Sequence, residues 1–291
     1  MDSQIPFPRL ALIGVGYIGG SAALAARRAG LVGAVVGCDV NPESCRQGRA
    51  RGVLDDVAES PAAAVAGASL VLLAAPVGSL SGLITSIAGH LVPSATVIDV
   101  GSVKLPVVVQ ADSVLPSGAF VACHPMAGAE HVGVAAADPD IFSGRLCYLC
   151  PGTRTRAEAV TAATRFWEGV GCQVARLDAA LHDQLMAAVS HLPHVAAYAL
   201  AGCLGQVLPL VEANAMPGGP TTSLRDTLRI AASSPQVWRD IFLANRDHLL
   251  PLVVALEQQV HALGKAMANG DAKALEAALI SGQANRRRLL K

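Results

Sequence analysis

The sequence predicts an α/β domain built on a parallel sheet, followed by an all-α domain. Up to Arg176, short apolar runs alternate with segments of helical periodicity. This alternation is typical of a parallel sheet covered by helices on both faces. After Asp178 the β-branched runs disappear, and long stretches rich in Ala and Leu continue to the last residues. We therefore divide the chain into residues 1–176 and 177–291.

Composition excludes several classes of protein. The 291 residues are 52% apolar, enough to fill substantial cores, and the 22 basic residues balance the 22 acidic ones. This balance leaves no electrostatic footprint for nucleic acid or for an anionic membrane surface. The N-terminus lacks the layout of a signal peptide, and no apolar run of about 18 residues is free of charges and breakers, so we expect a soluble cytoplasmic protein.

The cysteines indicate a reducing environment and no metal site. Seven cysteines are scattered along the chain, an odd number that fits buried thiols better than a disulfide framework. Cys147 and Cys150 form a lone CxxC pair in a strand-like run. Because no second pair or nearby histidine completes a zinc site, we predict no bound metal.

The elements of the α/β domain follow from local runs. Apolar, β-branched runs predict strands, and the segments between them have the apolar spacing of helices. The predicted strands span 9–13, 34–38, 70–74, 95–100, 119–123, 145–149 and 172–176, and the predicted helices span 19–30, 43–51, 78–90, 104–115 and 154–169.

The all-α domain is predicted from long helical stretches. They span 178–212, 235–269 and 271–289, and a turn-rich break at 216–223 precedes a short helix at 224–232. Long apolar helices in so small a domain cannot all bury their apolar faces against one another. We therefore expect a homodimer that shares a helical core.

A glycine-rich turn follows the first predicted strand. In this turn Gly14 permits a tight bend, Gly16 lets the backbone approach a pyrophosphate, and Gly19 lets the next helix pack close to the strand. Asp39 directly follows the second predicted strand, twenty residues after Gly19 (39 − 19). That is the spacing of the acid that holds a ribose 2′-hydroxyl. The pattern favours a Rossmann-type dinucleotide site over a glycine-rich turn with an unrelated surface aspartate.

The residues after Asp39 favour NAD as the dinucleotide. Val40 and Asn41 follow the acid, and no adjacent arginine is present to receive the 2′-phosphate of NADP. Arg46 lies a little downstream and keeps NADP open as an alternative.

Three polar clusters stand out at strand ends or in apolar helical sequence. They are DVGSVK at 99–104, HPMAGAE at 124–130 and SHLPH at 190–194. The first two follow strands, at the sheet edge where ligands bind in such folds. A serine such as Ser102 caps a helix about as often as it contacts a ligand, and a lone histidine such as His124 is often structural. In SHLPH, Pro193 removes a backbone donor and loosens the helical turn.

Together these segments resemble the prephenate and arogenate dehydrogenases of tyrosine biosynthesis. The resemblance covers nearly the whole chain and rests on segments in the family's order: GVGYIGGS at the start, APVG at 75–78, the three clusters above, and RDTLRIAASSPQVWRDI at 225–241. It implies an NAD-binding domain followed by a helical dimerisation domain, with the active site in the cleft between them.

The resemblance also implies roles for individual residues. His124 matches a catalytic histidine that bonds the substrate hydroxyl, and Ser102 matches the serine that orients it and the nicotinamide. Arg229 matches an arginine that receives a substrate carboxylate. The other implied substrate-binding residues are Ser190, His191, His194 and Glu130, and the implied cofactor-binding residues are Gly14, Gly16, Tyr17, Ile18, Gly19, Asp39, Pro76 and Ser102.

The expected reaction is oxidative decarboxylation of prephenate. His124 would take the hydroxyl proton as hydride leaves for NAD, and loss of the ring carboxylate would give 4-hydroxyphenylpyruvate. In the resembling family, a histidine at the position of His194 goes with prephenate, which favours prephenate over arogenate, although a dual-substrate enzyme also fits.

Two more distant alternatives remain. The first is another dehydrogenase or imine reductase with a Rossmann domain and a helical domain, such as a β-hydroxyacid dehydrogenase. Such enzymes depend on a catalytic lysine in the helical domain, where only Lys265, Lys273 and Lys291 occur, all late in the chain. A sensor that binds NAD(H) without turnover explains the glycine turn but not the clusters around His124 and His191.

Overall fold

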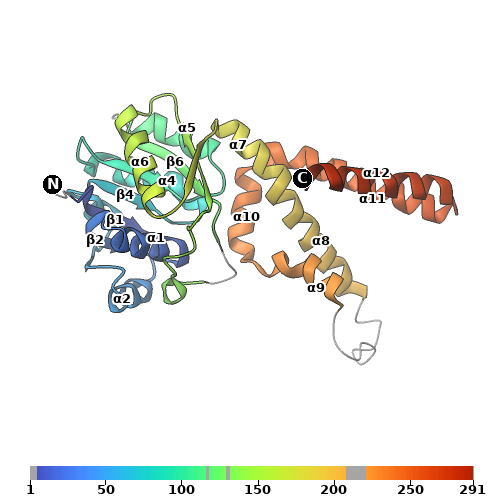
Figure 1. Cartoon of the computed structure of the whole chain (residues 1–291), viewed down its shortest axis with the longest axis horizontal. Helices are drawn as coiled ribbons and strands as arrows, with labels where there is room; N and C mark the ends of the chain where they lie inside the picture. The colour runs from blue at the N-terminus through green and yellow to red at the C-terminus, as the bar shows by residue number, and fades with distance from the viewer. Residues whose placement is uncertain (1–4, 116–117, 129–131, 208–220, 291) are drawn as a thin grey trace.

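The computed structural model describes residues 5–115, 118–128, 132–207 and 221–290 and has two parts (Figure 1). A sheet of eight strands with helices packed around it forms the N-terminal part, and the rest is helical. The predicted fold class, a Rossmann-type domain followed by an all-α domain, is therefore confirmed.

The strand order of the sheet is β3-β2-β1-β4-β5-β6-β7-β8. Seven of these strands lie on the predicted runs, and only the two-residue edge strand β3 was not predicted, since it is too short to have a pattern. The strands are β1 (Phe7–Ile13), β2 (Val32–Cys38), β3 (Asp56–Val57), β4 (Leu70–Leu73), β5 (Thr96–Asp99), β6 (Phe120–Pro125), β7 (Leu146–Pro151) and β8 (Gln173–Arg176).

The sheet is parallel, as predicted, except at one pair of strands. β7 runs antiparallel to β6, with His124 opposite Tyr148, whereas every other pair is parallel. A parallel partner needs a crossover connection, usually a helix. The described part of the connection from β6 to β7 has only a 3-10 turn, η2 (Val134–Ala136), so the chain returns in the opposite direction.

Helices cover both faces of the sheet, as its buried strands require. One apolar core lies between the sheet and α1 and α6, and a second lies between the sheet and α4 and α5. Cys147 belongs to the first core and Cys150 to the second. The CxxC pair therefore points to opposite faces of the sheet. The helices of this domain are α1 (Tyr17–Arg28), α2 (Pro42–Ala50), α3 (Pro61–Val65), α4 (Val77–Ile87), α5 (Leu105–Val114) and α6 (Ala157–Gly169).

The helical part departs from the predicted stretches at two breaks. A π-helical turn at Ala187–His191 interrupts the first stretch, and the predicted helix 235–269 is two helices separated at the buried Asn245. Residues 208–212 of the first stretch lie outside the described residues. The helices are α7 (Ala179–Met186), α8 (Leu192–Val207), α9 (Thr222–Leu228), α10 (Pro235–Ala244), α11 (Arg246–Ala268) and α12 (Ala272–Leu289), with a 3-10 turn, η5, at Arg229–Ala232.

The two parts share one core where they meet. The second apolar core includes Ala179 of α7 and Ile241 of α10 beside residues of α4 and α5. α7 and α10 both lie against the sheet domain, and the α11–α12 hairpin extends away from it (Figure 1). The carboxyl edge of the sheet therefore faces the helical part.

One helical run in the described residues, 179–206, is long and apolar enough to cross a membrane by length and composition. These two properties do not distinguish a membrane span from a helix covered by a second protein chain. The run holds His182, Asp183 and His191 with no exposed surface or nearly none.

Candidate active site

The glycine turn between β1 and α1 has the geometry expected of a pyrophosphate site. Gly14 has φ +95°, and a Cβ there would lie 2.4 Å from the carbonyl oxygen of Ala74. A Cβ at Gly19 would lie 2.5 Å from the carbonyl oxygen of Gly14, so only glycine allows this packing of helix on strand. Beside Gly16 there is open space, and no side chain caps the first turn of α1. Its free amides favour an anion.

Asp39 joins this turn to the end of β2. One carboxylate oxygen accepts a hydrogen bond from the Val15 amide at 2.7 Å and the other from the Asn41 amide at 2.8 Å. Each oxygen keeps a second lone pair for a ligand hydroxyl. Val40 beside it is fully exposed, and Arg46 is ion-paired with Glu43 in the same helix.

The other predicted cofactor residues lie at the same edge of the sheet. Tyr17 and Ile18 form the first turn of α1, Pro76 is the exposed N-cap residue of α4 after β4, and Ser102 follows β5. These residues therefore follow the carboxyl ends of β1, β4 and β5.

A buried ion pair supports the ends of β5 and β6. Asp99 and Lys104 have no exposed surface and contact each other directly. Asp99 accepts a hydrogen bond from the Cys123 amide at 2.8 Å, and Lys104 Nζ donates to the Cys123 carbonyl at 2.8 Å. This pair therefore fixes the backbone immediately before His124.

His124 contacts a second histidine from the helical part. Its Nδ1 lies 2.8 Å from Nε2 of His182, and Nδ1 of His182 lies 2.8 Å from Oδ1 of Asp183. Asp183 in turn accepts hydrogen bonds from the amides of Lys104 and Leu105 at 2.7 and 2.8 Å. The first turn of α5 and the start of α7 thus meet at this carboxylate.

Burial holds the pKa of His124 well below 6.5, and repulsion from the basic side chains of His182, Lys104 and His191 lowers it further. The imidazole is therefore neutral at physiological pH, which is the state that a proton acceptor needs.

The two histidines of SHLPH lie at the end of the π turn and in the first turn of α8. Since Pro193 has no amide hydrogen, the regular helical bonding is broken here, and the turn widens to include an extra residue. His194 lines the cavity described below, and its Nδ1 donates to the Ser190 carbonyl at 2.9 Å. The prediction that His191 also faces the substrate is not met, because this ring is fully buried behind Trp238 and accepts from Asn245 Nδ2 at 3.0 Å.

A cavity of about 670 Å³ lies between the two parts. It brings together His124 from the sheet domain with Arg229 and His194 from the helical part. Its full lining is Ser102, His124, Pro125, Met126, Ala127, Gly128, Ser190, His194, Arg229, Ile230, Ser233, Trp238 and Ile241. The predicted residues Ser102, His124, Ser190, His194 and Arg229 therefore share one site, whereas Glu130 lies outside the described residues.

Three residues of this region were missed in the sequence. His182 and Asp183 lie about two helical turns before SHLPH on the same apolar run, and this polar pair was a usable signal. Trp238, which lines the cavity, lies in the segment 225–241 that carries the family resemblance, but no role was predicted for it because a tryptophan in an apolar helix usually belongs to a core. Among the described residues, no group of three or more His, Cys, Asp or Glu is arranged to hold a metal ion.

Comparison with known proteins agrees with this architecture. Residues 22–176 match the model of the prephenate dehydrogenase nucleotide-binding domain, and residues 178–280 match that of the prephenate dehydrogenase dimerization domain. A solved prephenate dehydrogenase from A. aeolicus, in complex with hydroxyphenyl propionate and NAD+, superposes with a TM-score of 0.87 at 31% identity, over 99% of this chain and 100% of that one.

Curated relatives show the same similarity. Prephenate dehydrogenase of Bacillus subtilis is 36% identical over 82% of this chain, which spans 64% of that protein's length. Cyclohexadienyl dehydrogenase of Zymomonas mobilis is 34% identical over 91% of this chain and 90% of its own length. With both halves of the chain matched, the protein belongs to the prephenate dehydrogenase family.

Proposed function

We propose that this protein is an NAD-dependent prephenate dehydrogenase that converts prephenate to 4-hydroxyphenylpyruvate. One observation carries the proposal: His124 and Arg229, from different parts of the chain, line a single cavity at the carboxyl edge of the sheet. Prephenate has a ring hydroxyl and two carboxylates, so it needs a proton acceptor and a cation within one small site. The cavity offers both.

Residues of the cavity would perform the proton transfer and the positioning. His124, neutral at physiological pH, would take the hydroxyl proton, and Arg229 would bind a carboxylate. Ser102 lies on the same wall and would orient the ring of His124 and the cofactor. Bound NAD would accept the hydride. Loss of the ring carboxylate as carbon dioxide then gives an aromatic product, which drives the reaction.

The proposed cofactor is NAD. The carboxylate of Asp39 would lie where NADP has its 2′-phosphate and would repel it. Arg46 is ion-paired with Glu43. The A. aeolicus structure of the same family was solved with NAD+, which supports this choice.

Prephenate is proposed over arogenate, which has an amine in place of the side-chain keto group. His194 lines the cavity, and the family resemblance associates a histidine there with prephenate. The relative from Zymomonas mobilis is named a cyclohexadienyl dehydrogenase, so activity with both substrates is the second candidate.

One assay tests the proposal. Purified protein is supplied with NAD and either prephenate or arogenate, and NADH formation and carbon dioxide release are followed together. We expect both signals with prephenate at equal rates, and a lower kcat/KM with arogenate. If neither substrate were turned over, the proposed function would be contradicted. NADH formation without release of carbon dioxide would contradict an oxidative decarboxylation.

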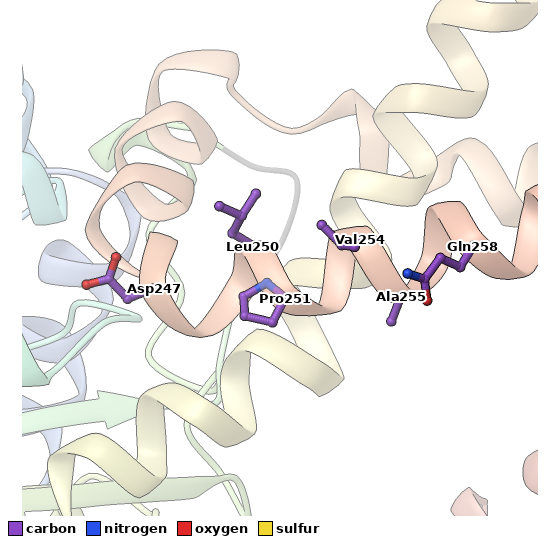
Figure 2. A pocket seen from close by; sticks show the side chains of 6 residues that line it. All are labelled: Asp247, Leu250, Pro251, Val254, Ala255 and Gln258. Atoms are coloured by element: carbon purple, nitrogen blue, oxygen red, sulfur yellow. The ribbon is translucent and has the colours of Figure 1, made fainter.

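We further propose that the protein is a homodimer through its helical part. Leu250, Pro251 and Val254 form an open apolar groove on α11 (Figure 2). Leu250 is 56% exposed and Val254 44% exposed, and apolar patches of this kind mark interfaces. A second copy would cover this face, and the matching family domain is named a dimerization domain.

Sedimentation of the purified protein tests the dimer. We expect a dimer for the wild type at micromolar concentration and a monomer for Leu250→Asp combined with Val254→Asp, because paired carboxylates cannot be buried without partners. A monomeric wild type would contradict the proposal. Val109→Asp is the matched control, since Val109 is an exposed apolar residue on α5 of the sheet domain.

We also propose that the protein is cytoplasmic. All seven cysteines are free thiols, and six are buried, which suits a reducing compartment.

A further inference from the structure

The proposed proton acceptor and the groups that hold it come from different parts of the chain. His124 ends β6, whereas His182 and Asp183 begin the helical part on α7. The three side chains form a continuous series of hydrogen bonds, each 2.8 Å long. His182 and Asp183 are buried, so water does not compete for these bonds.

The direction of the hydrogen bonds follows from the carboxylate. A carboxylate only accepts, so Nδ1 of His182 donates to Asp183. With its one ring hydrogen on Nδ1, His182 has a free lone pair on Nε2, and this nitrogen accepts from Nδ1 of His124. The hydrogen of neutral His124 is therefore on Nδ1, and its Nε2 carries the lone pair that proton abstraction requires.

Asp183 is fixed by the sheet domain. Its two oxygens accept from the amides of Lys104 and Leu105 in the first turn of α5, where helix amides favour a negative charge. Asn245 Nδ2 holds the carbonyl of Asp183 from the other side at 2.8 Å. Correct placement of the carboxylate thus depends on the contact between α7 and α5.

We propose that His182 and Asp183 are positioning residues that set the tautomer of His124 and spread the positive charge that it gains. This rests on the proposed function. When the substrate hydroxyl proton moves to Nε2 of His124, the new imidazolium already donates its Nδ1 hydrogen to His182, which Asp183 polarises. The base is therefore competent only when the helical part is docked on α5.

Two substitutions of His182 separate positioning from a general structural role. Gln keeps an oxygen that accepts from Nδ1 of His124, whereas Leu removes the acceptor. We expect His182→Leu to lower kcat with prephenate about 10²- to 10⁴-fold, with KM for NAD unchanged, and His182→Gln to recover at least about tenfold of this loss. Equal kcat values for wild type, Gln and Leu variants would overturn the proposal.

Asp183→Asn tests the charge. The amide keeps one acceptor oxygen for His182 but has no negative charge, so we expect a loss in kcat of about 10²-fold or more with an unchanged KM. Should His182→Leu fail to fold, this variant and His182→Gln carry the kinetic test. The pair His90→Gln and His90→Leu is the matched control, because His90 is an exposed histidine of η1 (Ala88–His90).

A spectroscopic measurement keeps this proposal separate from the proposed function. Proton–nitrogen correlation spectra of histidine-labelled protein report which ring nitrogen carries hydrogen and need no substrate. We expect the Nδ1–H tautomer of His124 in the wild type and a shift toward the Nε2–H tautomer in His182→Leu. An Nε2–H tautomer in the wild type would overturn the positioning role, even if prephenate is turned over. Absence of turnover with the expected tautomers would overturn only the assigned reaction.

Discussion

The imidazole of His194 and the indole of Trp238 lie face to face, with ring centroids 3.4 Å apart and an interplanar angle of 18°. Both rings line the cavity. The stack, together with the hydrogen bond from Nδ1 of His194 to the Ser190 carbonyl, leaves this imidazole with little freedom. Trp238 is therefore a structural partner of a predicted substrate-binding residue.

Trp238 should report substrate binding by its fluorescence. The only other tryptophan, Trp167, is a fully buried core residue of α6 and does not line the cavity. We expect prephenate to change the emission of the wild type but not of Trp238→Phe. Trp238→Ala should raise KM about threefold to tenfold, the range expected from one aromatic pair. If prephenate changed the emission of Trp238→Phe as much as that of the wild type, this placement of Trp238 would be contradicted.

His124→Asn should remove the proton acceptor without removing the cofactor site. We expect kcat to fall at least about 10²-fold, since general-base catalysis typically contributes that much. NAD binding, measured by calorimetry, should stay within about twofold because the glycine turn is unchanged. Near-normal turnover would exclude His124 as the base.

The buried His191 should make the stability of the protein depend on pH. Its pKa is lowered from 6.5 to about 4, mainly by burial. Between these values the unfolded chain binds more protons than the folded chain, so the free energy of unfolding falls as pH falls through this window.

We expect His191→Gln to reduce the fall in the free energy of unfolding across this pH window by on the order of 3 kcal/mol. The side-chain oxygen of the new glutamine can still accept the hydrogen bond from Asn245. Urea unfolding near neutral pH and near the lower end of the window measures the difference. Identical pH dependence in both proteins would contradict a depressed pKa for His191.

Asp39 and Val40 should control the choice of dinucleotide. Asp39→Ser with Val40→Arg removes a charge that repels a 2′-phosphate and adds one that binds it. We expect the ratio of kcat/KM for NADP over NAD to rise at least about 100-fold. Arg46→Ala is the control and should change the ratio little, because Arg46 is ion-paired with Glu43. A strong loss of NADP activity in that control would show that Arg46 binds the phosphate.

Lys104→Met should destabilise the sheet domain by about 3 to 5 kcal/mol, because it leaves the buried carboxylate of Asp99 without its cation. Chemical denaturation measures the loss. Arg28→Ala, which breaks an exposed ion pair with Asp140, should leave the midpoint almost unchanged. Equal effects of the two substitutions would contradict the role of burial.

Much of the architecture is predictable from local sequence. The glycine turn, the acid at the end of β2 and the apolar strands are each specified by a few adjacent residues, and the structure has them where expected. The break at Asn245 was not predictable, because the apolar pattern continues across it and only burial of this polar side chain among distant partners interrupts the helix.

By itself the sequence determined the two-part fold, the dinucleotide turn and the position of His124 at a strand end, because these depend on neighbouring residues. Only the tertiary structure decided that His182 contacts His124, that His191 is buried while His194 lines the cavity, and that β7 runs antiparallel to β6. Those outcomes depend on how residues far apart in the chain pack together, and no local spacing encodes such contacts.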